Sequence, residues 1–149
     1  MSAPKKGGGE KAAESSPLVM LVDDYVDNRE VYAHYLRYKG YRVEEAEDGH
    51  QALEKAARYQ PDLIVMDLAL PGLDGWEATR RLKSDPQTRG IPVIALTGHA
   101  MEGQSDRAKA AGCDAFVVKP CEPSHLEARI RSLLATHVEG GRPGSRRRG

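Results

Sequence analysis

The sequence predicts a doubly wound α/β domain, in which a parallel five-stranded sheet is covered by helices on both faces. The first observation is that short apolar runs alternate with helical patterns along the chain, giving a (βα)5 order. Strands that alternate with helices are typical of a parallel sheet. The second observation is that most of these runs are continuously apolar, as expected of strands that are buried on both faces.

Five short segments are expected to form the strands of this sheet. They are residues 18–22, 41–46, 63–66, 92–96 and 115–118. The second segment, YRVEEA, mixes apolar and charged residues, which favours a position at an edge of the sheet. Right-handed crossovers between the parallel strands leave only a few possible topologies.

Five helices are expected between and after the strands, over residues 27–39, 49–59, 75–84, 101–111 and 123–137. The first begins with Asp27 and Glu30 at the spacing of a capping box, and Gly40 ends it. The last has the clearest amphipathic pattern, with apolar side chains at i, i+4, i+7 and i+8: Leu126, Ile130, Leu133 and Leu134.

Length and composition favour one folded domain over residues 18–138. We expect disordered tails on both sides, a Gly- and Ser-rich one over 1–17 and a basic one over 139–149 that includes Arg146–Arg148. The chain has 22 basic and 22 acidic residues, but residues 18–138 carry 15 basic and 19 acidic ones. A mildly acidic body with a short basic tail argues against direct DNA binding. No apolar run is long enough to cross a membrane. Two cysteines are too few for a disulfide framework, so reduced thiols and a cytoplasmic location are expected.

Polar side chains follow four of the expected strands. Asp23 and Asp24 follow the first strand, Asp67 the third, Thr97 the fourth and Lys119 the fifth. Because the carboxyl ends of parallel strands meet at one edge of a sheet, we expect these five side chains to converge on one pocket.

The chemistry of this set indicates a phosphoryl-transfer site. Three carboxylates in one pocket repel one another, and Lys119 supplies only one compensating charge. A divalent cation with hard oxygen ligands, Mg²⁺ or alternatively Mn²⁺, is the natural second source. A metal ion, an ammonium, a hydroxyl and a carboxylate together can hold a phosphoryl group, and the carboxylate itself can be the nucleophile.

Four motifs, in this order and spacing, resemble the response-regulator receiver domain of two-component signalling. They are LVDD at residues 21–24, DLALPGLDGW at 67–76, ALTGHA at 95–100 and FVVKP at 116–120. The resemblance covers residues 18–138 and implies the flavodoxin-like strand order 2-1-3-4-5.

The resemblance implies a role for each matching residue. Asp67 would be the phospho-acceptor, and Thr97 and Lys119 would contact the phosphoryl group. Asp24 would bind the metal directly and Asp23 partly through water, and Asp67 would also be a metal ligand. The remaining implied features are a metal-bound backbone carbonyl at Ala69, a cis peptide bond between Lys119 and Pro120, an aromatic switch at Phe116, and tuning of the phosphoryl lifetime by Ala69 and His99.

The resemblance also implies the function and the partners. A sensor histidine kinase or a histidine phosphotransfer protein would phosphorylate Asp67 in a Mg²⁺-dependent phosphorelay. The surface formed by the fourth helix, fifth strand and fifth helix would then bind an unknown downstream protein. The chain would be a monomer or a phosphorylation-dependent dimer. It would catalyse only its own phosphorylation and dephosphorylation, and would not be a turnover enzyme.

Two other classes share parts of this pattern. A phosphatase of the haloacid-dehalogenase type also uses an aspartate nucleophile and Mg²⁺, but it needs a second Asp where this chain has Ala69. A flavodoxin-type FMN binder has the same architecture, but the Asp23–Asp24 pair would repel the FMN phosphate.

Overall fold

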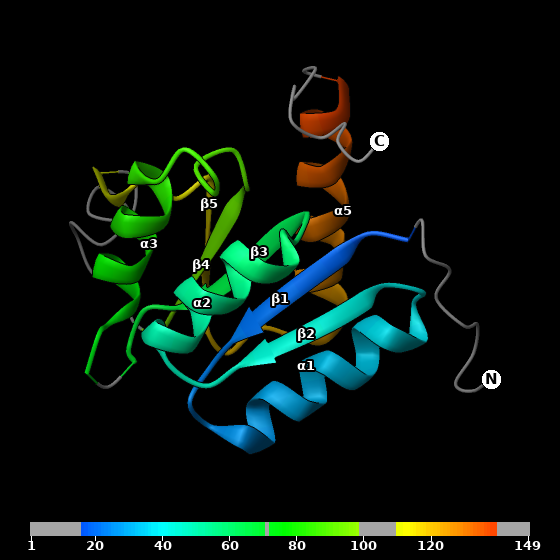
Figure 1. Ribbon diagram of the computed structural model, residues 1–149. Helices are drawn as coiled ribbons and strands as arrows, with labels where there is room; N and C mark the ends of the chain where they lie inside the picture. The colour runs from blue at the N-terminus through cyan, green and yellow to red at the C-terminus, as the bar shows by residue number, and fades with distance from the viewer. Residues whose placement is uncertain (1–15, 71, 99–109, 140–149) are drawn as a thin grey trace, which may run out of the picture.

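The computed structural model describes residues 16–70, 72–98 and 110–139. Its sheet has five parallel strands: β1 (Leu18–Val22), β2 (Arg42–Ala46), β3 (Leu63–Asp67), β4 (Val93–Thr97) and β5 (Ala115–Val118). Their order is β2-β1-β3-β4-β5 (Figure 1). The predicted fold class is therefore confirmed, and so is the edge position of the second strand.

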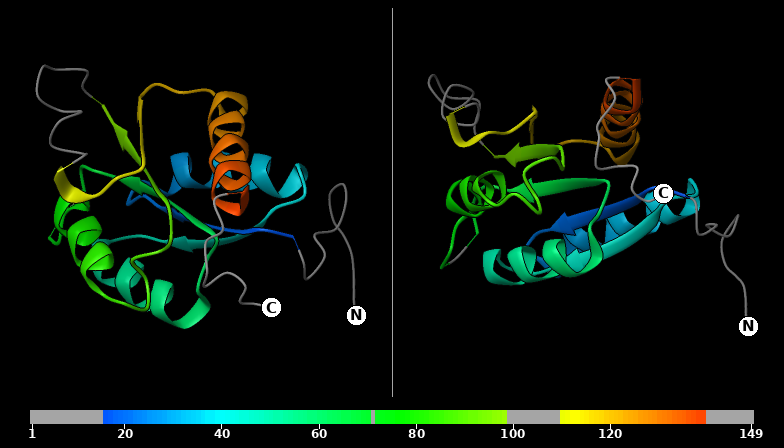
Figure 2. Two further views of the ribbon diagram at one scale, coloured as in Figure 1. Left: turned by 90° about the horizontal axis from the view of Figure 1, so that it is seen from above. Right: turned by 45° about the horizontal axis from the view of Figure 1, so that its top comes forward.

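Helices cover both faces of this sheet. The helices α1 (Val26–Tyr38) and α5 (Pro123–Glu139) lie on one face, and α2 (Gly49–Tyr59) and α3 (Gly75–Ser84) lie on the other (Figure 2). The predicted helix over 101–111 lies outside the described residues except for 110 and 111, which are helical. Most of both predicted tails also lies outside them. Within the described ranges, no helix has the length and apolar character of a membrane span.

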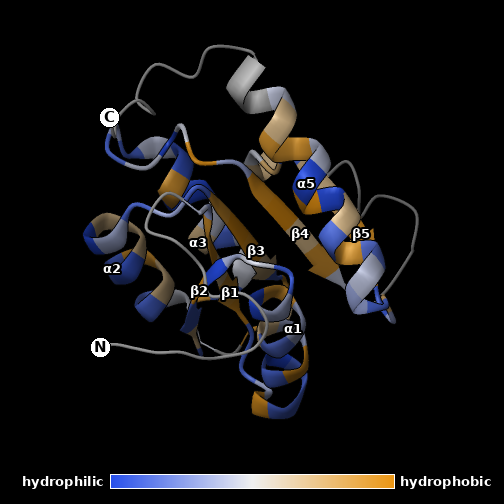
Figure 3. Ribbon diagram, turned by 90° about the vertical axis from the view of Figure 1, so that its right-hand side faces the viewer, coloured by the Kyte–Doolittle hydropathy of each residue, from blue (hydrophilic) through white to orange (hydrophobic). Residues whose placement is uncertain are grey.

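Alternation along the strands divides the core into two apolar layers. Figure 3 shows that the central strands are largely hydrophobic. On β1, Met20 and Val22 pack on the side of α2 and α3, whereas Val19 and Leu21 pack on the side of α1 and α5. All four side chains are at most 2% exposed. Burial of an aliphatic side chain contributes about 1.5–3 kcal/mol, so both layers hold the strand ends in place.

The start of α1 differs from the capping box predicted at Asp27 and Glu30. The helix begins at Val26, and its N-cap residue is Tyr25, which makes no side-chain cap bond. The reason is that the chain turns earlier, since Asp23 Oδ1 accepts a hydrogen bond from the Tyr25 backbone N–H at 2.9 Å. At the other end, Gly40 has φ +100°, and its N–H donates to the Arg37 carbonyl, as expected for a glycine that ends a helix.

Candidate functional site

The carboxyl edge of the sheet brings together the acidic residues that the sequence places after β1 and at the end of β3. Asp23, Asp24 and Asp67 each offer a carboxylate oxygen within 4.8 Å of the other two. Lys119, just after β5, places its Nζ 3.4 Å from Asp67 Oδ2 and 4.0 Å from Asp23 Oδ2. Side chains separated by up to 96 sequence positions therefore form one cluster, as the parallel topology predicts.

The Asp23 side chain is held by the loop that joins β1 to α1. The backbone N–H of Asp23 donates to the Ala46 carbonyl of β2 at 3.0 Å, which extends the sheet by one residue. Its Oδ1 accepts the Tyr25 N–H, and Asp23 is only 4% exposed. Its Oδ2 is buried and has no hydrogen-bond donor among the described residues.

The environment of Asp23 disfavours its charged form. Burial raises the pKa of its carboxyl group above the ordinary value, and the nearby Asp67 carboxylate raises it further. The Tyr25 N–H and the Lys119 ammonium lower the pKa, but they do not reverse the shift. A buried carboxylate that is both unsatisfied and repelled by its neighbour indicates a place for a cation.

Asp67 ends β3 and is 4% exposed. Its Oδ1 accepts a hydrogen bond from the Ala69 N–H at 3.0 Å, which leaves Oδ2 facing Lys119. Gly75, the first residue of α3, lies against this segment, because a Cβ at Gly75 would overlap the Asp67 carbonyl oxygen and lie 2.7 Å from Leu68 Cα. The backbone of Asp67 and Leu68 is therefore packed closely against the start of α3.

Thr97 and Lys119 are positioned by the pairing of β4 with β5. Thr97 ends β4 and is 5% exposed, and its carbonyl accepts the Lys119 N–H at 2.7 Å. The Lys119–Pro120 peptide bond is cis, as the sequence resemblance implies. The next residue, Cys121, is tied to α1 because its carbonyl accepts a hydrogen bond from the Tyr32 hydroxyl at 2.7 Å.

The remaining predicted positions lie at or beyond the margin of the cluster. Phe116 on β5 is half-buried and packs against the core layer on the side of α2 and α3. Ala69 is exposed and follows Asp67 by two residues. His99 lies outside the described residues.

An open groove borders Lys119 on the side of α1. It has a volume of about 470 Å³. Its lining residues come from α1, from Gly98 and from the segment around the cis peptide bond: Asn28, Val31, Tyr32, Gly98, Lys119, Pro120, Cys121 and Pro123. Val31 is 56% exposed, so the wall formed by α1 presents an apolar side chain to solvent. The groove gives access to the Lys119 side of the cluster.

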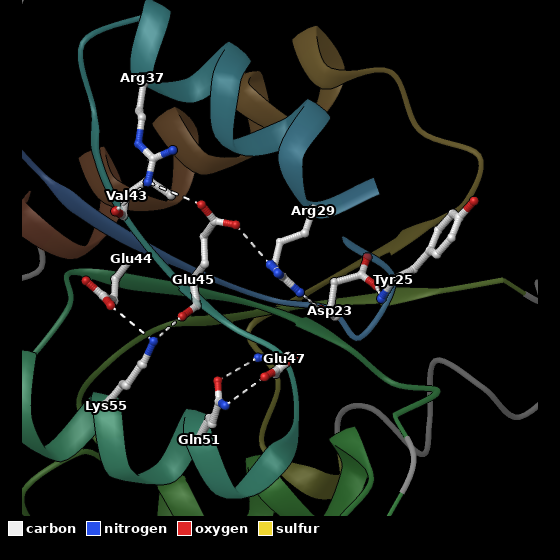
Figure 4. A network of polar contacts seen from close by, with 10 residues as sticks. All are labelled: Asp23, Tyr25, Arg29, Arg37, Val43, Glu44, Glu45, Glu47, Gln51 and Lys55. Atoms are coloured by element: carbon white, nitrogen blue, oxygen red, sulfur yellow. Dashed lines mark hydrogen bonds and ion pairs between the residues drawn. The ribbon is translucent and has the colours of Figure 1, made fainter. Parts of the chain in front are cut away.

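Sequence analysis missed a polar network behind Asp23 (Figure 4). Arg29 on α1 donates from Nη1 to the Asp23 backbone carbonyl at 2.6 Å and from Nε to Glu45 Oε1 at 2.9 Å. Arg37 donates from Nη2 to Glu45 Oε2 at 3.3 Å and to the Val43 carbonyl. The unusual charges in the edge strand were the only sequence signal for it.

The donor set fits a hard divalent cation. Three carboxylates supply oxygen ligands, of which that of Asp24 is exposed and the other two are buried. The described cluster contains no sulfur or imidazole group. The orphaned Asp23 Oδ2 would gain a partner from a cation that Asp24 and Asp67 also contact. Mg²⁺ needs only one or two protein carboxylates, because it keeps several waters.

Comparisons with known proteins show the family of this chain. The model of the response regulator receiver domain family matches residues 19–131. The polar-differentiation response regulator DivK of Brucella anthropi is 38% identical over 116 residues, which cover 78% of this chain and 94% of that protein.

Solved structures with the same fold include two receiver-type proteins. The chemotaxis response regulator CheY4 of Vibrio cholerae is 30% identical, with a TM-score of 0.75, covering 79% of this chain and 98% of that one. The receiver domain of the sensor histidine kinase PA1611 from Pseudomonas aeruginosa is 35% identical, with a TM-score of 0.75, covering 81% and 99%. That structure has a magnesium ion coordinated in its active site cleft.

Proposed function

This chain belongs to the response-regulator receiver domain family, and from this premise we propose that it accepts a phosphoryl group on Asp67 in a Mg²⁺-dependent reaction. The single observation that carries the proposal is the cluster of Asp23, Asp24 and Asp67 with Lys119 Nζ 3.4 Å from Asp67 Oδ2. Receiver domains are signalling modules, so the modified carboxylate is the product that matters.

The reaction is a transfer from a phosphohistidine to a carboxylate. An Asp67 oxygen forms a bond to phosphorus while the phosphorus–nitrogen bond of the donor breaks, and the released imidazole takes a proton. Lys119 neutralises charge on the phosphoryl oxygens, and the Thr97 hydroxyl donates a hydrogen bond to one of them. Asp23, Asp24, Asp67 and the Ala69 carbonyl would hold the Mg²⁺, which supplies further charge neutralisation when bound.

Two alternative functions for this chain, a phosphatase of the haloacid-dehalogenase type and an FMN binder, are less well supported. Position 69 carries no acid, since it is Ala69, and the clustered carboxylates of Asp23 and Asp24 would repel a flavin phosphate. The family membership of the chain supports neither class.

The direct test is to incubate the full chain with Mg²⁺ and acetyl phosphate, and to locate any adduct by mass spectrometry. We expect a single phosphoryl adduct on Asp67 that requires Mg²⁺ and disappears in Asp67→Asn. The matched control is Asp27→Asn, because Asp27 is an exposed acid in the first turn of α1 outside the cluster. An adduct that survives Asp67→Asn, or none in the wild type, would contradict the proposal.

We place the docking surface of the phosphodonor on α1 and the groove beside Lys119. The donor is a sensor histidine kinase or a histidine phosphotransfer protein, whose histidine must reach Asp67. The groove opens next to Lys119 and is lined on α1 by Val31, which is 56% exposed. Val26, also on α1, is 45% exposed. Exposed apolar residues beside a polar site are typical of protein contact surfaces.

A charge introduced on this surface separates docking from chemistry. Val31→Asp is expected to slow transfer from a phosphorylated histidine phosphotransfer protein at least about tenfold, because it places a charge in an apolar contact. Labelling by acetyl phosphate should stay unchanged. Tyr59→Asp is the matched control, since Tyr59 is 42% exposed on α2, on the other face of the sheet. Equal slowing by both variants would refute this location.

Signalling output is assigned to the surface of β5, α5 and the predicted helix over 101–111. Phosphorylation would pull the Thr97 hydroxyl toward the phosphoryl group and let Phe116 shift inward, which changes the population of a partner-binding state. Val118 on β5 is 37% exposed, so the strand presents an apolar side chain on this surface. The test is to measure binding of the downstream protein to the chain with and without beryllofluoride. We expect the two affinities to differ.

A further inference from the structure

We infer that Arg29 is a positioning residue for the metal-binding acids, acting through the backbone carbonyl of Asp23. The inference rests on the proposed function, because it assigns a role in the same Mg²⁺ site. Its basis is the forked contact of one guanidinium with the Asp23 carbonyl at 2.6 Å and with Glu45 Oε1 at 2.9 Å (Figure 4).

The contact fixes the peptide group at which the chain leaves the sheet. The Asp23 N–H is held by the Ala46 carbonyl of β2, and the Asp23 carbonyl is held by Arg29. Arg29 is itself held by Glu45, the residue before Ala46. The end of β2 and Arg29 therefore clamp the Asp23 backbone at its N–H and at its carbonyl. This clamp fixes the direction in which the Asp23 side chain points.

The geometry of the Asp23 carboxylate depends on this clamp. Because the backbone is fixed, Oδ1 reaches the Tyr25 N–H at 2.9 Å, and Oδ2 is left facing the cluster. The exposed Asp24 is the next residue, so the peptide group between Asp23 and Asp24 also orients the Asp24 side chain. The side chain of Arg29 is 13% exposed, which limits competition from water for its two bonds.

The Arg29 contact acts on the acids without pairing with their charge. Its side-chain hydrogen bonds go to a backbone carbonyl and to Glu45, and the charges that shift the pKa of Asp23 are those of Asp67 and Lys119. The sign of a substitution effect therefore separates two explanations. Removal of a nearby positive charge by itself strengthens the binding of a cation, whereas loss of the clamp weakens it.

The test compares Arg29→Ala with Arg37→Ala in the full chain. Arg37 is the matched control, because it also carries one positive charge on α1 and bonds to Glu45, but it contacts the Val43 carbonyl and not Asp23. Mg²⁺ dissociation constants are measured by isothermal titration calorimetry. We expect Arg29→Ala to weaken Mg²⁺ binding at least about tenfold, the lower end for groups that orient metal ligands. Arg37→Ala should change it less than about twofold, as a surface charge does.

Two further readouts separate positioning from a general loss of structure. Hydrogen exchange of the Tyr25 N–H in metal-free protein should become faster in Arg29→Ala and not in Arg37→Ala. The initial rate of acetyl phosphate labelling in Arg29→Ala should fall at low Mg²⁺ and recover toward the wild-type rate at saturating Mg²⁺.

Glu45→Ala tests the same clamp without altering Arg29, in case Arg29→Ala does not fold. It should weaken Mg²⁺ binding as well, and in the Arg29→Ala background it should add nothing further. Unchanged or tighter Mg²⁺ binding in Arg29→Ala, or equal weakening by Arg29→Ala and Arg37→Ala, would overturn the inference. If the wild type itself binds no Mg²⁺, the proposed function fails and the inference falls with it.

Discussion

The close approach of α3 to the loop behind Asp67 leads to a prediction about Gly75. Alanine at position 75 would place its Cβ 2.7 Å from Leu68 Cα and 3.0 Å from the Asp67 carbonyl carbon, and it would overlap the Asp67 carbonyl oxygen. All of these neighbours are backbone atoms. They cannot move aside as the end of a flexible side chain does, so the helix or the loop must shift.

Two opposing effects decide the size of the change. Alanine in place of glycine favours a helix by about 0.5–1 kcal/mol. Overpacking in a tight core costs about 1–3 kcal/mol. Because the three nearest atoms all belong to the backbone of Asp67 and Leu68, we expect the cost to be near its upper end. Gly75→Ala should then lower the free energy of unfolding by about 2 kcal/mol.

Urea unfolding followed by circular dichroism measures this difference. The control is Gly90→Ala, because a Cβ at Gly90 has no neighbour within 4 Å and the φ of Gly90 lies outside the left-handed region. This substitution should change the free energy of unfolding by less than about 0.5 kcal/mol. Gly75→Ala should also reduce Mg²⁺ affinity, since the displaced backbone carries Asp67. Equal or greater stability of Gly75→Ala than of the wild type would refute the reasoning.

Three other substitutions have expected outcomes. Because burial and a like charge raise the pKa of Asp23, metal-free wild type should lose stability as pH rises from the ordinary value of 3.8 through the raised folded pKa. In Asp23→Asn, the free energy of unfolding measured over the same pH range should not show this decrease, and Mg²⁺ binding should be weaker. Tyr41→Phe removes the hydrogen bond to the buried Glu127 at 2.8 Å and should cost about 1–3 kcal/mol by thermal unfolding, with Mg²⁺ affinity unchanged. Tyr32→Phe removes the bond to the Cys121 carbonyl, costs about 1 kcal/mol, and should slow acetyl phosphate labelling.

The order of strands and helices could be predicted, because the sequence of most strands contains a recognisable apolar run. Runs such as residues 63–66 are apolar at every position, and the strand that contains them is buried at every residue. The convergence of Asp67 and Lys119 followed from topology alone, because parallel strands end at the same edge. Neither prediction needed knowledge of a side-chain contact.

The clamp on Asp23 could not be predicted in the same way. Arg29 is three residues inside α1, and on the sequence it is one of many charged residues on a helix. Its role depends on how α1 packs beside β2, which brings Glu45 within 2.9 Å of its Nε. The start of α1 was missed for a related reason. The Asp27–Glu30 spacing is a local pattern, but the turn before α1 is set by the Asp23 carboxylate, which belongs to the site.

The distribution of positive charge explains how the acidic cluster can prefer a cation. Only Lys119 faces the carboxylates of Asp23 and Asp67 in an ion pair among the described residues, so one ammonium is set against three acids. Arg29 lies nearby, yet Glu45 and the Asp23 carbonyl take its hydrogen bonds. If Arg29 paired directly with the acids, it would compete with Mg²⁺ for the same oxygens. Since Glu45 and the Asp23 carbonyl take the hydrogen bonds of Arg29, three carboxylates face a single ammonium, and such a cluster suits a divalent ion.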